Sequence, residues 1–340
     1  MSDQKRQKTN PTEKMSSPLK ICVHSGSFHA DEALGYYLLK LLPRFKDATL
    51  IRSRDQAQWE ASDIVIDVSG KYDGVKFFDH HQRGFEETFS DDYSTKLSSA
   101  GLVYKHFGRE IISEVLKLNS ADENVDLLYL KMYKEFVESL DANDNGIEAY
   151  PKEVKPAFHY RNITLPSIVA NFNPSWNEDH SDEVYYRQFL VASDFIGNCF
   201  LRMLKSLGNS WLPAKKVVSD AFVKRFDVDK SGRILILDQF APWKEHLYDI
   251  EFKNDAKGEI TYVLFEDTSG SWRISTVPIT SSSFSNRRPL PEKWRGVRDQ
   301  ALSDLTGVEG CVFVHAAGFI GGAKTKDAVL KLARMSLTMD

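Results

Sequence analysis

Asp79, His80 and His81 form a run of three side chains that could hold a metal ion or move a proton. The run directly follows a short apolar segment at 75–78, which the pattern predicts to be a strand. Other residues of the same types stand at the ends of other predicted elements, and they are His24, His29, Asp31, Asp67 and Asp141.

Taken singly, each of these residues has an ordinary structural explanation. An aspartate after a strand, such as Asp31 or Asp141 alone, usually forms a turn or caps a helix. A single histidine is usually a polar surface residue or a satisfied core residue. Several such groups on one edge of a sheet are harder to explain in this way, because closely grouped carboxylates repel one another unless a cation lies between them.

The ligand types indicate which cation this would be. Carboxylate and imidazole without cysteine favour a divalent ion such as manganese, with magnesium as the second choice. Two such ions a few ångströms apart would activate a water and stabilise both the attacking and the leaving oxygen. The residues therefore predict phosphoester hydrolysis.

The surrounding pattern predicts the elements that position these residues. Apolar runs at 19–24, 48–52 and 64–66 are predicted strands, in addition to 75–78. Helical spacing covers 31–42, 98–118 and 124–140. Strands that alternate with helices predict a parallel sheet with helical crossovers, and the carboxyl ends of such strands meet at one ligand-binding edge.

The second half of the chain has a different predicted pattern of helices and strands. Four prolines between 150 and 180 indicate a connector, and helices are predicted at 182–207 and 213–227. Strands are predicted at 233–237, 260–265, 272–277 and 311–314, the middle two as a hairpin, before a terminal helix from about residue 327. The predicted organisation is a tail over 1–18, a parallel-sheet α/β domain over 19–150, a helical connector continuing it over 151–230, and an α+β domain over 231–340.

Length and composition exclude several classes of protein. With 340 residues, the chain is long enough for two domains. It has no apolar run of membrane-spanning length, and its three cysteines form no pair typical of zinc sites or of a disulfide framework. A net charge of −4 means that any contact with nucleic acid must come from a local patch. The polar tail 1–18 is read as disordered or as a targeting segment, with a basic cluster weakly consistent with nuclear import.

Several motifs together resemble the DHH phosphoesterase superfamily. The segment 78–81 is similar to its signature, 64–67 to its second motif and 139–141 to its fourth. The segment 24–33 is similar to the first motif, but it is one residue longer and has His29 in place of the first aspartate. With 139–146 and 314–322, the chain from about residue 19 resembles the melanocyte-proliferating-gene (Myg) branch of that superfamily.

The resemblance implies an activity and a set of roles. Members of the branch are described as 3′-to-5′ RNA exonucleases that link nucleus and mitochondria, so single-stranded RNA is the implied substrate. Asp67 would bridge two ions, His81 would face the phosphate or protonate the leaving group, and Asp79 would orient a histidine ring. The implied metal ligands are His24, His29, Asp31, Asp67, His80 and Asp141.

The resemblance also implies that a C-terminal domain closes over the site and contacts the substrate. His315 with Gly318, Gly321 and Gly322 resembles a shortened His-x-x-Ala-Ala-Gly element, whose glycines would let backbone amides approach a phosphate. A plain strand-to-helix turn is the alternative. Arg287 and Arg288 begin a basic segment that could hold phosphates or could be a solvated loop.

Other readings stay open at this stage. The metal core alone would equally suit a small-molecule phosphatase or pyrophosphatase, and a metal-binding scaffold without catalysis is a third hypothesis. The apolar helix faces would allow a homodimer or would pack internally. The resemblance suggests the nucleus and the mitochondrion, the cytoplasm is an alternative, and secretion is not expected.

Overall fold

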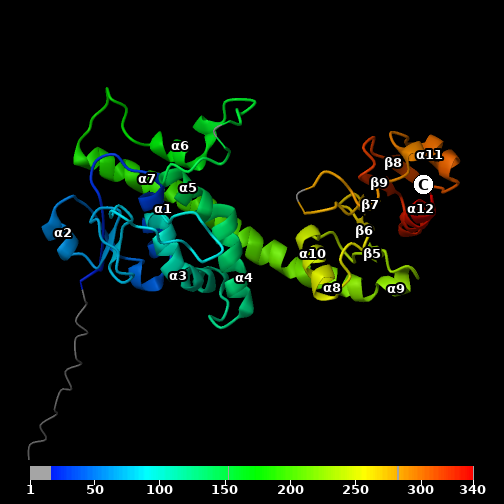
Figure 1. Ribbon diagram of the computed structural model, residues 1–340, viewed down its shortest axis with the longest axis horizontal. Coiled ribbons are helices and arrows are strands. Elements are labelled where there is room, and N and C mark those ends of the chain that lie inside the picture. The colour runs from blue at the N-terminus through cyan, green and yellow to red at the C-terminus, as the bar shows by residue number, and fades with distance from the viewer. Residues whose placement is uncertain (1–16, 152, 282, 340) are drawn as a thin grey trace, which may run out of the picture. The chain divides into compact units, whose positions relative to one another are not determined.

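The computed structural model describes residues 17–151, 153–281 and 283–339, which fall into two compact units (Figure 1). The first unit ends at Lys205 and the second begins at Ser206. The connector predicted for 151–230 is therefore divided between the units. Most of the predicted tail, residues 1–16, lies outside the described residues.

The first unit contains a four-stranded sheet in the order β2-β1-β3-β4, and every neighbouring pair is parallel. This confirms the predicted parallel sheet. The inner strand β1 carries Ile21, Cys22 and Val23, which are fully buried, as is typical of a parallel strand covered on both faces. The strands are β1 (Lys20–Val23), β2 (Thr49–Arg52), β3 (Ile64–Ile66) and β4 (Phe77–Phe78).

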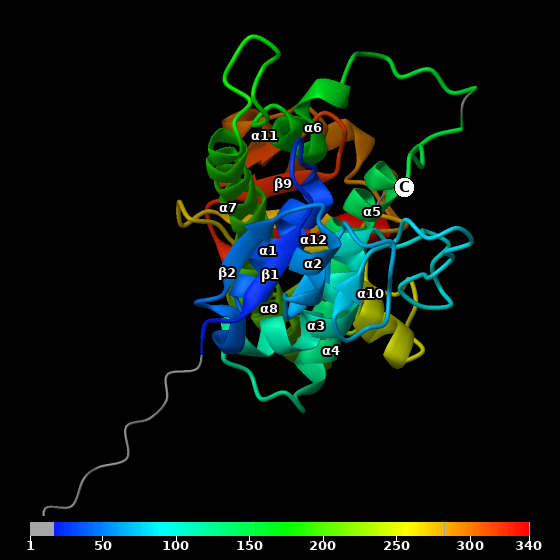
Figure 2. The same ribbon diagram turned by 90° about the vertical axis from the view of Figure 1, so that its left-hand side faces the viewer.

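Two helices of the first unit, α1 (Ala30–Lys40) and α3 (Ser99–Leu116), pack against each other beside the sheet (Figure 2). Helix α1 begins with a capping box, in which the backbone N–H of His29 donates to Oε1 of Glu32 at 2.8 Å. Helix α7 (Asp182–Ser206) packs on α1, where Oγ of Ser193 donates to the carbonyl of Ala33 at 2.8 Å. Two shorter helices are α2 (Gln56–Glu60) and α6 (Leu165–Ala170).

The helix predicted at 124–140 continues further than expected. Helix α4 (Glu123–Met132) runs through a π-helical turn at Tyr133–Val137 into α5 (Glu138–Asp144). Such π-helical turns occur often at functional sites. The extension carries Asp144 one turn beyond Asp141 on the same helix.

The second unit is a five-stranded mixed sheet in the order β5-β6-β7-β9-β8. The pair β6-β7 is antiparallel, which confirms the predicted hairpin. Strand β9, which was not predicted, falls within the glycine-rich segment for which a phosphate-binding element and a strand-to-helix turn were the two alternatives. The strands are β5 (Ile234–Ile236), β6 (Tyr262–Glu266), β7 (Trp272–Thr276), β8 (Cys311–Val314) and β9 (Ile320–Ala323).

Helices cover both faces of this second sheet. Leu264 packs in a cluster with residues of α11 (Asp299–Thr306) and α12 (Lys326–Thr338). Its neighbour Val263 belongs to a separate cluster with residues of α8 (Leu212–Val223) and α10 (Lys244–Lys253). The alternation along β6 therefore divides the core into two layers. A short helix, α9 (Arg225–Val228), precedes β5.

Among the helices of the described residues, none combines the length and the apolar character that a membrane-spanning helix needs.

Gly101 in α3 tests how closely the helices of the first unit approach each other. A Cβ atom there would lie 2.3 Å from Oδ1 of Asp141, so we expect Gly101→Ala to lower the free energy of unfolding by about 1–3 kcal/mol. Gly35→Ala in α1 is the matched control, because its Cβ would make only ordinary contact, 3.5 Å from Ile66. Chemical denaturation should show the control as neutral or slightly stabilising, and equal behaviour of the two variants would contradict the packing described here.

Candidate metal centre

A cavity of about 680 Å³ lies in the first unit, beyond the carboxyl ends of β1 and β3. Six of the residues predicted to act in the site line it, namely His24, His29, Asp31, Asp67, Asp79 and His81. Asp144, which was not predicted, also lines it. The parallel topology has therefore brought together side chains that lie more than a hundred positions apart in the sequence.

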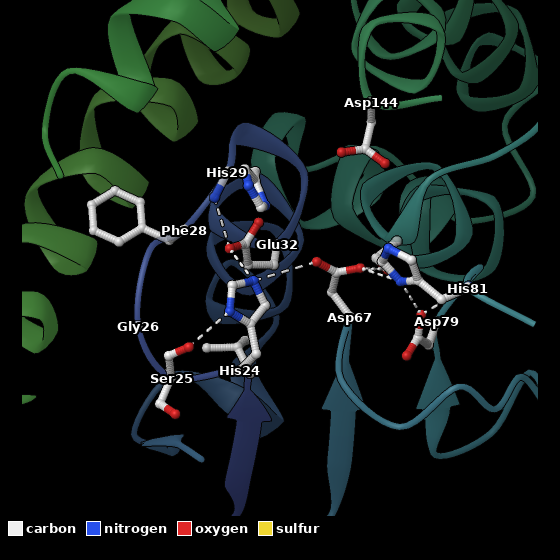
Figure 3. A network of polar contacts seen from close by, with 12 residues as sticks. His24, Ser25, Gly26, Phe28, His29, Glu32, Asp67, Asp79, His81 and Asp144 are labelled. Carbon is white, nitrogen blue, oxygen red and sulfur yellow. Dashed lines mark hydrogen bonds and ion pairs between the residues drawn. The ribbon is translucent and has the colours of Figure 1, made fainter. Parts of the chain in front are cut away.

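Asp67 is at the centre of the polar network in this cavity (Figure 3). Its Oδ2 lies 3.5 Å from Nε2 of His24, and its Oδ1 lies 3.3 Å from Nδ1 of His81 and 3.7 Å from Nε2 of His80. Oδ1 also accepts a hydrogen bond from Ser99 at 3.0 Å. The residue has φ of 58°, a left-handed conformation that is strained for aspartate. Each oxygen thus faces a different histidine group.

His24 and Glu32 form the side of the network next to α1. Nε2 of His24 lies 2.8 Å from Oε1 of Glu32, and both side chains are buried. Burial favours the neutral imidazole, but the hydrogen bond to Glu32 and the charges of Glu32 and Asp67 together outweigh it and raise the pKa of His24. Burial likewise opposes ionisation of Glu32, but the contact with His24 lowers the pKa of that carboxyl. The pair therefore favours its charged form.

Asp31 has a buried carboxyl group whose two oxygens accept no hydrogen bond in the structure. Burial, followed by the charges of Asp67 and Glu32, raises the pKa of this group well above its usual range. Leaving a buried carboxylate without a partner is costly, and a bound cation removes the cost. Oε2 of Glu32 also has no hydrogen-bond partner. These oxygens fit a metal ion.

A second group of candidate metal ligands lies where strand β4 and helix α5 end. Nε2 of His80 lies 2.9 Å from Oδ2 of Asp144, yet the buried nitrogen makes no hydrogen bond of acceptable geometry. Asp31, His80 and Asp144 each offer one ligand atom, and these atoms lie within 4.8 Å of one another. The two further groups of this kind among the described residues are His24, His29, Glu32 and Asp67, and Asp67, His80 and His81.

Asp79 supports His81 from the base of the site. Its Oδ1 accepts from the backbone N–H of His81 at 3.0 Å and lies 2.8 Å from Nδ1 of the same residue, while Oδ2 accepts from the backbone of Gly70 at 2.6 Å. The hydrogen bond to Asp67, helped by Asp79 and opposed by burial, raises the pKa of His81 to about 9. Asp79 is thus placed to orient the imidazole.

Asp141 lies beneath the site, outside the three groups of candidate ligands. Its Oδ1 accepts from the backbone N–H and Oγ of Ser98 at 3.0 and 2.7 Å, and its Oδ2 accepts from the hydroxyl of Tyr133 at 3.0 Å. Burial raises its pKa to about 7 despite these hydrogen bonds. Three donors from the protein already satisfy this carboxyl.

Two residues of the ligand groups were not singled out from the sequence. Asp144 had a detectable signal, because it follows Asp141 by one helical turn and therefore shares its face. Glu32 also had one, as an acidic residue in the first turn of a predicted helix and a neighbour of Asp31. Both signals equally suit a capping residue or a solvated residue, so spacing alone could not select them.

In the second unit, His315 is exposed and its Nδ1 accepts the backbone N–H of Ala317 at 3.1 Å. This leaves Nε2 as the donor of the neutral ring. Gly318 has φ of 72°, and a Cβ there would lie 2.6 Å from Nε of Arg295. Gly321 and Gly322 lie in β9, where strand packing rather than an open loop requires their small size.

The predicted substrate-binding arginines are occupied within the second unit. Both terminal nitrogens of Arg287 bind the buried Glu251, at 2.6 and 2.7 Å. Nε of Arg288 donates to the carbonyl of Ser336 at 3.0 Å, near the end of α12. These contacts give both side chains a structural role in holding the domain together.

Asp31→Asn tests whether the buried carboxyl is kept for a cation. In the presence of a chelator we expect the variant to be more stable than the native chain by about 1 kcal/mol, because the repulsion from Asp67 and Glu32 is removed. Manganese should then raise the melting temperature of the native chain but much less that of the variant. Asp91→Asn, at an exposed position, is the control. A variant less stable than the native chain in chelator would contradict the interpretation.

Comparison with known proteins places the chain in a family. The family model MYG1_exonuc, described as "Uncharacterised protein family (UPF0160)", matches residues 20–337. A MYG1 protein of Saccharomyces cerevisiae is 58% identical, covering 99% of this chain and 100% of the relative. The MYG1 exonuclease of Homo sapiens is 45% identical, covering 95% and 87% respectively. A crystal structure of exonuclease RecJ bound to manganese covers 95% of this chain and 91% of its own, at 13% identity and a TM-score of 0.24, a likeness too weak to bear on the site. The predicted resemblance is confirmed, and the chain belongs to the MYG1 exonuclease family.

Proposed function

We propose that this protein is a metal-dependent nuclease that removes nucleotides from single-stranded RNA in the 3′-to-5′ direction with two divalent cations. The observation that carries the proposal is Asp67, whose two oxygens face different groups of histidines beside unpartnered buried carboxylate oxygens. Manganese is the favoured ion and magnesium the second, because the ligands are carboxylates and imidazoles.

The ligand groups suggest how the ions are held. We assign one ion to the side formed by His24, His29 and Glu32, and the other to the side formed by Asp31, His80 and Asp144. Asp67 would be shared between them. We assign Asp141 to the support of the site, since its oxygens are already satisfied.

When bound, two ions would activate a water and stabilise the charge that develops on the phosphodiester. His81 lies at the exposed side of the same cavity, with Asp79 and Asp67 beside its Nδ1. Its raised pKa suits a residue that neutralises the phosphate or gives a proton to the leaving oxygen. Asp79 would keep the ring in the orientation for this transfer.

The substrate class rests on the family. Relatives in Bos taurus and Homo sapiens carry the name MYG1 exonuclease, which supports a nucleic-acid substrate. Single-stranded RNA, the 3′-to-5′ direction, and work in nucleus and mitochondrion are part of the proposal because the resemblance to the Myg branch implies them. His315 and Gly318 are the substrate contacts proposed for the second unit, since the histidine is exposed with a free Nε2 donor. Gly321, Gly322, Arg287 and Arg288 are not carried into the proposal.

The alternatives are distinguished by their products. We expect purified protein in manganese to cleave labelled single-stranded RNA, with mononucleotides released from the 3′ end and a ladder visible on a 5′-labelled strand. Preferential cleavage of pyrophosphate or mononucleotides would favour a small-molecule phosphatase. Binding of manganese without cleavage of any substrate would favour a scaffold. Single-stranded DNA of the same sequence serves as the comparison for RNA specificity.

Substitutions of two aspartates on one helix distinguish a metal ligand from a residue that supports the fold of the site. Asp144→Asn should lower nuclease activity by about 100-fold or more and weaken manganese binding, with little change in the melting temperature of the metal-free chain. Asp141→Asn should instead destabilise the first unit by about 1–3 kcal/mol, because it replaces one of the two acceptor oxygens that bind Ser98 and Tyr133 by an amide donor.

The control for both variants is His180→Ala, at an exposed histidine outside the cavity. Activity, manganese titration and thermal unfolding are measured on all three proteins. Loss of manganese binding in Asp141→Asn, with Asp144→Asn unaffected, would reverse the assignment made here.

A further inference from the structure

Arg54 lies just beyond β2 and lines the same cavity as the proposed metal ligands. Its Nε donates to the carbonyl of Ser25 at 3.2 Å, and its Nη2 lies 3.2 Å from Nδ1 of His24. The side chain is exposed, and in the described part of the chain no carboxylate is recorded within ion-pair distance of it. Among the described residues that line the cavity, it is the one lysine or arginine.

The charge of the cavity favours a further cation once a phosphate enters. Five carboxylates belong to the cavity lining or the ligand groups; two divalent ions would offset four of those charges, and a protonated His81 would offset the fifth. A phosphodiester would bring a further negative charge into this environment. A permanently charged guanidinium with several donors is suited to bind its oxygens.

The hydrogen bonds around His24 leave the guanidinium of Arg54 available. Nδ1 of His24 lies 3.2 Å from the carbonyl oxygen of Ser25 and also 3.2 Å from Nη2 of Arg54. One ring nitrogen cannot donate to a carbonyl and accept from a guanidinium at the same time. A doubly protonated ring carries a proton on Nδ1, and so does a neutral ring that binds an ion through Nε2. In both states Nδ1 donates to Ser25 and is no acceptor for Arg54.

We propose that Arg54 binds a non-bridging phosphate oxygen of the substrate. The inference rests on the proposed function, because it places the scissile phosphate in the metal cavity. It adds a substrate-binding residue from the first unit, supplied by the loop after β2.

Arg54→Met keeps an unbranched side chain that reaches about as far as Nε, and it removes the charge and the donors. We expect inorganic phosphate to bind the manganese-loaded variant on the order of 10- to 100-fold more weakly than the native chain, as for a lost charged hydrogen bond. Manganese affinity should change by no more than about twofold, because Arg54 is not a ligand. Arg54→Lys should recover only part of the loss, since it cannot offer two parallel donors.

Arg187→Met, at an exposed arginine of the same unit outside the cavity, is the matched control. Calorimetric titration of manganese, and then of phosphate into manganese-loaded protein, measures both affinities without any cleavage. Native phosphate affinity in Arg54→Met would overturn the proposal, and so would a loss of manganese affinity large enough to explain the phosphate result. Because inorganic phosphate is the probe, a native chain that binds phosphate but cleaves no RNA would contradict the proposed nuclease and leave the role of Arg54 standing.

Discussion

The repulsion between carboxylates gathered at one edge of a parallel sheet is the constraint on which the first unit depends. Asp31 and Asp67 are buried, Glu32 is fully buried beside them, and the oxygens of Asp31 have no donor. Parallel topology creates this crowding, because strands far apart in the sequence end at the same edge. A divalent cation resolves it, so the arrangement that is least favourable for the metal-free chain is the one that binds metal.

The rest of the first unit holds this arrangement in place. Ser98 and Ser99, at the start of α3, donate to Asp141 and Asp67 respectively, so one turn of helix fixes both a supporting carboxyl and the central one. Gly101 lets α3 approach Asp141 closely enough for this contact. The same helix extension that buries Asp141 brings Asp144 beside His80. In the proposed assignment, the supporting carboxyl of Asp141 and the candidate ligand Asp144 therefore lie one turn apart on the same helix.

In the second unit, the glycine-rich segment predicted from the sequence is present, but part of it forms a strand. The glycine-rich segment after His315 contains strand β9, in which Gly321 and Gly322 pack against neighbouring strands. Gly318 lies in the turn between β8 and β9 and has a positive φ, which glycine adopts without strain. The basic residues Arg287 and Arg288 bind within their own domain, because a buried carboxylate and a helix end need the same donors as a phosphate.

The sequence alone determined the parallel sheet, the hairpin at β6-β7, the family, and six of the residues that line the cavity. These follow from hydrophobic periodicity and from short motifs, which are local properties of the chain. Tertiary structure decided which aspartate of α5 faces His80, because that choice depends on a π-helical turn and on the donors Ser98 and Tyr133. It also decided that Glu32 and Arg54 belong to the site, since neither spacing nor composition reveals which charged side chain of a helix start or a loop points into a cavity.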